Sequence, residues 1–222
     1  MSAALNIEIG FDFICPWCLI GLRNLQTALA QLHAEQPQAT VRLNWRGVQL
    51  LPTVPPEGLP FHAFYLRRLG GEAALRQRQA EVQRAADAAG ARIDYSVIEV
   101  MPNTADAHRL LAYAGRHGSV AQRDALLERL LRAYFEEGDD IGNRLVLLAH
   151  GEAAGFERAA MEAELLGAEQ RYHAGPGIGG SGVPFYAING KLALTGAQPP
   201  AVLLATLREA LAAGPTTEPP TP

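Results

Sequence analysis

The chain has two cysteines, and they stand three residues apart in the tetrapeptide Cys15-Pro16-Trp17-Cys18. A thiolate can attack a disulfide, and a second thiol close by can then attack the mixed disulfide that results. A structural bridge at this spacing would restrain little of the unfolded chain. We therefore expect the pair to be chemical rather than structural.

The sequence around the pair predicts where it lies. Residues 5–13 alternate apolar and polar side chains, as strands do, whereas leucines recur at three- and four-residue steps over residues 22–32, as in an amphipathic helix. Proline favours the first position of a helix, which makes Cys15 the capping residue. Because free amides and the positive end of the helix dipole stabilise a thiolate there, we expect Cys15 to attack and Cys18 to resolve.

Two other kinds of site have weaker support. The cysteine pair could provide half of a zinc site, but structural zinc takes about four ligands and no second pair exists. The glycine-rich segment 177–182 matches GxGxxG yet precedes an expected strand, so we interpret it as a flexible loop. We expect neither a metal nor a bound cofactor. The six histidines show no paired ligand spacing, and we interpret each as a surface or capping residue: His33, His62, His108, His117, His150 and His173.

The rest of the chain predicts a strand at residues 41–48, a long helical region and a C-terminal hairpin. Asn189-Gly190 separates two short apolar segments, which is typical of a type I′ turn. A last helix follows Pro199-Pro200, and the residues from Gly214 onward read as a loose tail. Helical patterns cover residues 59–89, 105–117, 121–137, 144–154 and 158–173.

Charge and hydropathy exclude several classes of protein. The formal charge is -4 and Lys and Arg are scattered, so we expect no nucleic-acid partner. No run is apolar and long enough to span a bilayer, and we expect no membrane association. The start, MSAALNIEIGFDF, lacks the basic residues and cleavage site of a secretory leader. We therefore expect a cytoplasmic protein.

Four stretches together resemble the DsbA-like family, in particular its FrnE-like branch, which is related to 2-hydroxychromene-2-carboxylate isomerases and kappa-class glutathione transferases. They are DFICPWCLIG, NTADAHRLLAYA, YFEEGDDIG and GVPFYAINGKLALTGAQPP. The resemblance implies an α/β chain: a thioredoxin fold with a large all-helical insertion between an N-terminal βαβ unit and a C-terminal ββα unit. Residues 1–50 and 183–213 would form the thioredoxin-fold domain, 51–182 the insertion and 214–222 a flexible tail.

The same resemblance implies roles for particular residues. Cys15 would be an exposed nucleophile and Cys18 a buried resolver. Pro184 would follow a cis peptide bond, and the backbone of Val183 would pair with an extended substrate. Trp17 would help bind substrate, and it replaces a histidine common in strongly oxidising members, which implies a weaker oxidant.

Two further residues have competing interpretations. Asp12, on the polar face of the expected first strand, is either a proton relay to Cys18 or a solvated strand residue. Asn103 matches by resemblance a position that helps hold glutathione, but asparagine before threonine is also an ordinary turn or helix cap.

We expect a thiol-disulfide oxidoreductase, a reductase or isomerase because the cytosol keeps thiols reduced. Its partners would be disulfide-containing proteins or small thiols such as glutathione, which would serve as a co-substrate. The main alternative is a glutathione-dependent isomerase or transferase like 2-hydroxychromene-2-carboxylate isomerase, although those enzymes usually carry serine where this chain has Cys15. A third is a holdase whose thiols are incidental. The sequence leaves the oligomeric state open.

Overall fold

A computed structural model describes residues 4–167, 170–173 and 182–213. Most of the glycine-rich segment 177–182 and the expected tail at 214–222 lie outside the described residues. The central sheet has the strand order β2-β1-β5-β6, with β2 parallel to β1 and the other two pairings antiparallel. Its strands are β1 (Ala4–Phe11), β2 (Thr40–Gly47), β5 (Phe185–Ile188) and β6 (Leu192–Thr195). This is the predicted thioredoxin fold.

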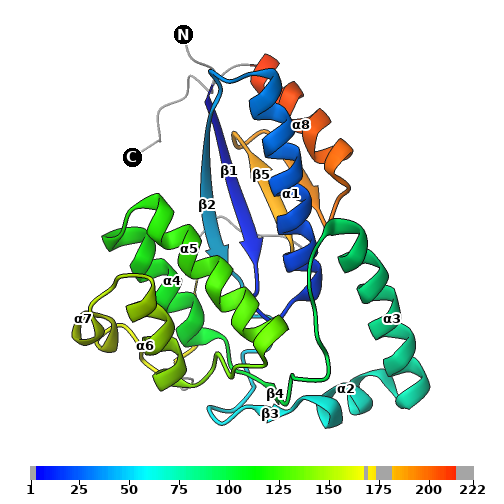
Figure 1. Ribbon diagram of the computed structural model, residues 1–222, viewed down its shortest axis with the longest axis vertical. Helices are drawn as coiled ribbons and strands as arrows, with labels where there is room; N and C mark the ends of the chain where they lie inside the picture. The colour runs from blue at the N-terminus through cyan, green and yellow to red at the C-terminus, as the bar shows by residue number, and fades with distance from the viewer. Residues whose placement is uncertain (1–3, 168–169, 174–181, 214–222) are drawn as a thin grey trace.

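Two helices cover one face of this sheet, α1 (Pro16–Glu35) and α8 (Pro200–Ala212), and they lie side by side (Figure 1). Alternate residues of β1, among them Leu5 and Ile7, pack against apolar side chains of both helices. The β5–β6 hairpin turns at Asn189 and Gly190, whose φ angles of 52° and 67° are those that a type I′ turn requires. The hairpin prediction is confirmed.

The insertion lies at the end of the sheet where β1 ends and α1 begins, with α2 and α3 on one side and α4 to α7 on the other (Figure 1). It also contains a two-stranded pairing of β3 with β4, so it is not all-helical; strands of two residues have no detectable periodicity. The elements are β3 (Leu59–Pro60), α2 (Phe61–Leu69), α3 (Glu72–Ala89), β4 (Val100–Met101), α4 (Ala105–His117), α5 (Val120–Arg132), the π-helical turn η1 (Ala133–Glu137), α6 (Arg144–Ala153) and α7 (Arg158–Glu162).

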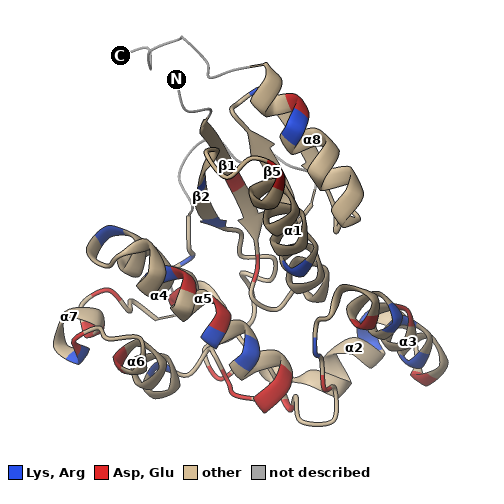
Figure 2. Ribbon diagram, turned by 45° about the horizontal axis from the view of Figure 1, so that its top comes forward, with Lys and Arg blue, Asp and Glu red and all other residues tan. Residues whose placement is uncertain are grey.

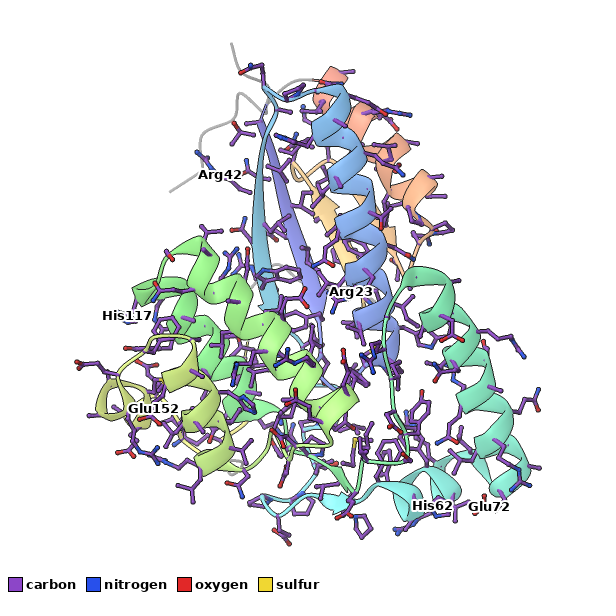
Figure 3. The ribbon with its side chains drawn as sticks, in the orientation of Figure 1. Arg23, Arg42, His62, Glu72, His117 and Glu152 are labelled. Atoms are coloured by element: carbon purple, nitrogen blue, oxygen red, sulfur yellow. The ribbon has the colours of Figure 1, made fainter. Side chains whose placement is uncertain are left out.

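The helical pattern over residues 59–89 forms two helices, α2 and α3. Gly70 and Gly71 have φ angles of 86° and 140°, a conformation open to glycine but not to a continuing helix. Across the break His62 Nε2 lies 2.9 Å from Glu72 Oε1, which ties the start of α2 to the start of α3 (Figure 3).

The helix expected over residues 158–173 is also wrong, because α7 stops at Glu162. The backbone amides of Leu166 and Gly167 donate instead to the carboxylate of Asp106 on α4, at 3.0 Å for the shortest contact of each. Hydrogen bonds to a distant side chain replace those that another helical turn would make.

Helix α1 belongs to two hydrophobic cores. Near its start Cys18, Leu19 and Leu22 pack with the insertion, whereas Leu25 and Leu32 further along pack with the sheet and α8. The start of α1 is therefore held by the insertion and the rest of the helix by the sheet.

The charges of the chain are mixed in space as they are in sequence. Lys or Arg occurs beside Asp or Glu on both α3 and α5 (Figure 2). Among the described residues no helix is long and apolar enough to cross a membrane.

Candidate active site at the cysteine pair

The cysteine pair lies where β1 gives way to α1. Cys15 caps the helix with φ -88° and ψ 109°, Pro16 takes the first helical position, and the Cys18 amide donates to the Cys15 carbonyl oxygen at 2.9 Å. The placement matches the expectation from sequence. It directs the Cys15 side chain toward the amides at the helix start.

Neither sulfur is freely exposed. Cys15 is 8% exposed and Cys18 is 4% exposed. The expectation that Cys15 is an exposed nucleophile is therefore wrong. Cys15 is reached instead through a cavity of about 550 Å³ that it lines and Cys18 does not. A disulfide entering that cavity meets Cys15 first.

The two thiols differ in acidity. The pKa of Cys15 is lowered, and the largest cause is a hydrogen bond from the Cys18 thiol. The backbone amides of Cys18 and Trp17 lower this pKa further, whereas burial and the negative charge of Asp12 raise it. Burial raises the pKa of Cys18 well above its ordinary value, and Cys15 raises it further. Cys15 is therefore the more acidic thiol and Cys18 keeps its proton longer, which is the order that attack by Cys15 needs.

This asymmetry can be measured by alkylation against pH. In reduced Cys18→Ser protein the hydroxyl can still donate to the Cys15 sulfur, so Cys15 should react with iodoacetamide at a pH below the ordinary thiol range of about 8.5. In Cys18→Ala protein that donor is lost, and the reaction at neutral pH should slow several-fold. Equal pH profiles for the two variants, or a midpoint at or above that of free cysteine, would contradict the assigned cause.

A second loop closes the site over Cys15. The Val183–Pro184 peptide bond is cis, and the Cys15 sulfur lies 4.0 Å from the Val183 carbonyl oxygen. Gly21, one turn beyond Cys18 on α1, makes room for this loop: a Cβ there would lie 2.9 Å from Pro184 Cγ and 2.4 Å from the Tyr186 hydroxyl. The structure thus brings Cys15, Val183 and Pro184 together.

The cavity beside Cys15 combines aromatic walls with basic side chains. Among the residues that the structure describes, five aromatic ones line it and no Asp or Glu does. Arg78 lies with its guanidinium 5.3 Å from the Trp17 ring centroid, and Arg68 lies over the Phe64 ring at 6.0 Å. Sequence analysis missed both arginines, since nothing in the pattern of α2 and α3 marks the face that meets Cys15. The aromatic residues are Trp17, Phe61, Phe64, Tyr65 and Tyr95.

Asp12 follows β1 rather than lying on its polar face, and it is fully buried. Its Oδ2 accepts from the Leu50 amide at 2.8 Å, and its Oδ1 lies 3.1 Å from Nε2 of His108. The interpretation of Asp12 as a solvated strand residue is therefore wrong. So is that of His108 as a surface or capping residue, because it is 1% exposed; His150, at 8%, is also buried.

Asn103 is buried and holds two segments together. Its Oδ1 accepts from Gln49 Nε2 at 2.8 Å and from the Ala105 amide at 3.0 Å, and its Nδ2 donates to the Val54 carbonyl at 2.6 Å. Asn103 does not line the cavity beside Cys15. These contacts favour the cap and turn interpretation over a role in holding glutathione. Within the described ranges, no three or more His, Cys, Asp or Glu residues gather as metal ligands would.

Residues 6–208 match the family described as the DSBA-like thioredoxin domain. A probable DsbA oxidoreductase from Streptomyces coelicolor superimposes with a TM-score of 0.75 at 22% identity, covering 98% of this chain and 93% of its own. A 2-hydroxychromene-2-carboxylate isomerase superimposes with a TM-score of 0.60 at 18% sequence identity. The match covers 94% of this chain and 95% of the isomerase chain. The cytosolic disulfide reductase DsbM from Pseudomonas aeruginosa, solved with GSH, superimposes with a TM-score of 0.55 at 19% sequence identity. The match covers 93% of this chain and 99% of the DsbM chain.

No curated protein sequence matches the chain significantly. At these identities the solved structures establish the fold, and the match to the family extends over almost the whole chain. The chain belongs to the DSBA-like thioredoxin domain family.

Proposed function

We propose that this protein is a thiol-disulfide oxidoreductase that exchanges disulfides through Cys15 and Cys18. One observation carries the proposal: the helix-capping Cys15, whose pKa is lowered, lines a cavity, while the pKa of Cys18 behind it is raised. A residue that only packed in the core would need neither the cavity nor the difference in acidity. The paired thiols also argue against a holdase with incidental cysteines.

The reaction takes two exchanges. The Cys15 thiolate attacks one sulfur of the substrate disulfide, and the other sulfur leaves as a thiolate. Cys18 then loses its proton and attacks the Cys15 sulfur, which releases the second substrate thiolate and leaves a Cys15–Cys18 disulfide. We propose that the Asp12 carboxylate, whose charge raises the pKa of both thiols, accepts the proton that Cys18 loses. The backbone beside Pro184 would pair with an extended substrate at Val183.

We further propose that the enzyme works as a reductase or isomerase in the cytosol. Trp17 supplies no imidazolium to stabilise a reduced Cys15, and a less stabilised thiolate makes a weaker oxidant. A disulfide reductase described as cytosolic, and solved with GSH, shares the fold. Glutathione is accordingly the co-substrate that would return Cys15–Cys18 to the dithiol, and no bound cofactor or metal takes part.

A comparison of two activities tests the function. Wild-type and Cys18→Ser proteins are assayed for glutathione-driven reduction of insulin disulfides and for isomerisation of 2-hydroxychromene-2-carboxylate. We expect insulin reduction in the wild type that is lost in the variant, because Cys18 must resolve the mixed disulfide. Strong isomerisation that survives the mutation would instead support the alternative, a glutathione-dependent isomerase.

The cavity makes a prediction about small substrates. Its aromatic walls and two arginines fit a disulfide with an apolar body and a negative charge, such as 5,5′-dithiobis(2-nitrobenzoate), better than the uncharged 2,2′-dithiodipyridine. The ratio of kcat/KM for the charged over the uncharged disulfide should fall about 3- to 5-fold in Arg68→Gln or Arg78→Gln, the range expected for one exposed ionic contact.

Neighbouring arginines on the same two helices provide matched controls. Arg67 on α2 and Arg76 on α3 do not line the cavity, so Arg67→Gln and Arg76→Gln should leave the ratio unchanged at equal ionic strength. A similar fall in all four variants would show that net charge, and not the cavity, sets the preference.

A further inference from the structure

His108 is a buried histidine that the reaction described above leaves unused. Its side chain and that of Asp12 are both 0% exposed, and Nε2 lies 3.1 Å from the Asp12 carboxylate. Asp12 raises the pKa of both thiols through its charge, and its backbone also hydrogen-bonds to the Cys18 sulfur. The charge of one carboxylate therefore acts on both thiols, while its oxygen Oδ1 contacts the imidazole.

The other ring nitrogen lies beside Gly47. Nδ1 of His108 is buried and has no hydrogen-bond partner among the described residues. Nδ1 packs closely against Gly47 beside Tyr172, because a Cβ on Gly47 would be 2.4 Å from Nδ1 and 2.8 Å from Tyr172 Cε1. The Tyr172 ring stacks on the imidazole at 5.1 Å, and its amide is held by Gln49 at 3.1 Å.

A second cavity of about 470 Å³ begins at this point. His108, Gly47 and Tyr172 line it, whereas Cys15 and the aromatic walls of the first cavity do not. The two cavities thus lie at opposite ends of a chain of groups that runs from the thiols through Asp12 to His108. The first cavity, at the cysteine end, admits the substrate. The second cavity, at the histidine end, has polar side chains in its lining and lies beside the buried Nδ1 of His108.

We propose that His108 is a positioning residue that acts through Asp12, sharing the proton that Cys18 gives up and exchanging it with water at the second cavity. The proposal rests on the dithiol exchange proposed above. It explains why a buried imidazole keeps one nitrogen on a carboxylate and the other at the edge of a cavity. A proton can then leave while substrate fills the first cavity.

The proton balance is as follows. When Cys18 attacks the mixed disulfide, its S–H bond breaks and the proton passes to the Asp12 carboxylate. The imidazolium of His108, which until then donates from Nε2 to the ionised Asp12 carboxylate, now faces a neutral acid that no longer stabilises its charge. Nδ1 then gives its own proton to water, and the reverse sequence returns a proton to Cys18 when the disulfide is reduced.

The charges around His108 are compatible with this role. Asp12 is the group in hydrogen-bond contact with the ring, and burial raises the pKa of Tyr172, which keeps its phenol neutral. The arginines of the second cavity are each paired with a carboxylate, which offsets their repulsion of an imidazolium. The other charged or titratable groups that line this cavity are Arg46, Arg116, Arg123 and His173, with Glu8, Glu164 and Asp124 as the partners of the three arginines.

The two exchanges can be timed separately with 5,5′-dithiobis(2-nitrobenzoate). Reduced protein releases one nitrothiobenzoate when Cys15 attacks and a second when Cys18 resolves. In His108→Gln an amide can still donate to Asp12 but cannot titrate. We expect the first phase to stay within about 2-fold, and the second to slow about 10-fold and to depend less on pH than in the wild type.

His150 provides a matched control. It is also buried, and its Nε2 lies 2.9 Å from Asp139 Oδ2, within the insertion. His150→Gln should leave both phases unchanged. In His108→Ala the lost ring leaves a void beside the second cavity, and added imidazole should speed the second phase in a saturable, pH-dependent way.

The outcomes separate this inference from the proposed function. A second phase in His108→Gln with the rate and pH profile of the wild type would overturn the role of His108, and so would equal slowing of both phases, which indicates a structural effect. A second phase that persists in Cys18→Ser would instead defeat the dithiol mechanism itself.

Discussion

Replacing Cys15 by serine should abolish disulfide exchange. Replacing Cys18 by serine should stop the reaction after the first exchange, with the substrate still bound to Cys15 as a mixed disulfide. Cys15 caps α1 and lines the substrate cavity, while Cys18 lies behind it with a raised pKa. Loss of an enzymatic nucleophile costs on the order of 10⁴-fold or more. We expect a loss of that size for Cys15→Ser.

The measurement is non-reducing electrophoresis and mass spectrometry after incubation with reduced and oxidised insulin or glutathione. Cys18→Ser should accumulate an adduct on Cys15 that dithiothreitol releases, because no thiol remains to resolve it. Cys15→Ser should accumulate none, since its remaining thiol is buried and protonated. Equal trapping by the two variants would reverse or remove the assignment.

Gly21→Ala should destabilise the protein and slow exchange, although alanine is ordinarily the better helix former. Its methyl group would lie 2.4 Å from the Tyr186 hydroxyl and 2.9 Å from Pro184 Cγ, which real side chains do not tolerate. Overpacking of this kind costs about 1–3 kcal/mol, against a gain of about 1 kcal/mol from helix propensity. The displaced Pro184 would also move the wall that faces Cys15.

Gly115→Ala is the matched control, since Gly115 also lies within a helix but a Cβ there would meet only Arg123 Cδ, at 3.6 Å. Urea denaturation should show a loss of stability for Gly21→Ala and a small gain for Gly115→Ala. Insulin reduction should fall in the first variant only. A gain in stability for Gly21→Ala would show that the Pro184 loop is not packed as described.

The parts of the site that sequence predicts are those encoded by local patterns. Strand alternation followed by helical spacing fixed Cys15 as the helix cap, and Asn189-Gly190 predicted the hairpin that carries Pro184. The break at Gly70 and Gly71 was also readable, because two adjacent glycines inside a helical pattern are a signal to stop.

The rest depends on contacts between distant segments. Asp12 and His108 are 96 residues apart, and neither residue type at its position indicates that the other will be near. Burial of a charged or polar side chain becomes predictable only when its partner is known. His108 does lie in the NTADAHRLLAYA stretch, on a helix whose neighbouring side chains are mostly apolar, and this was the available hint that it faces inward.

Helix α1, shared between the two cores, makes the chain one thermodynamic unit. If the insertion unfolded, Leu19 and Leu22 would lose their packing partners, and if the sheet separated from α8, Leu25 and Leu32 would lose theirs. Neither part can open without removing support from the helix on which the other depends, so partial unfolding is penalised and unfolding is cooperative. Any free-energy difference between the dithiol and disulfide forms at Cys15 is therefore expressed in the stability of the whole molecule, not of one lobe.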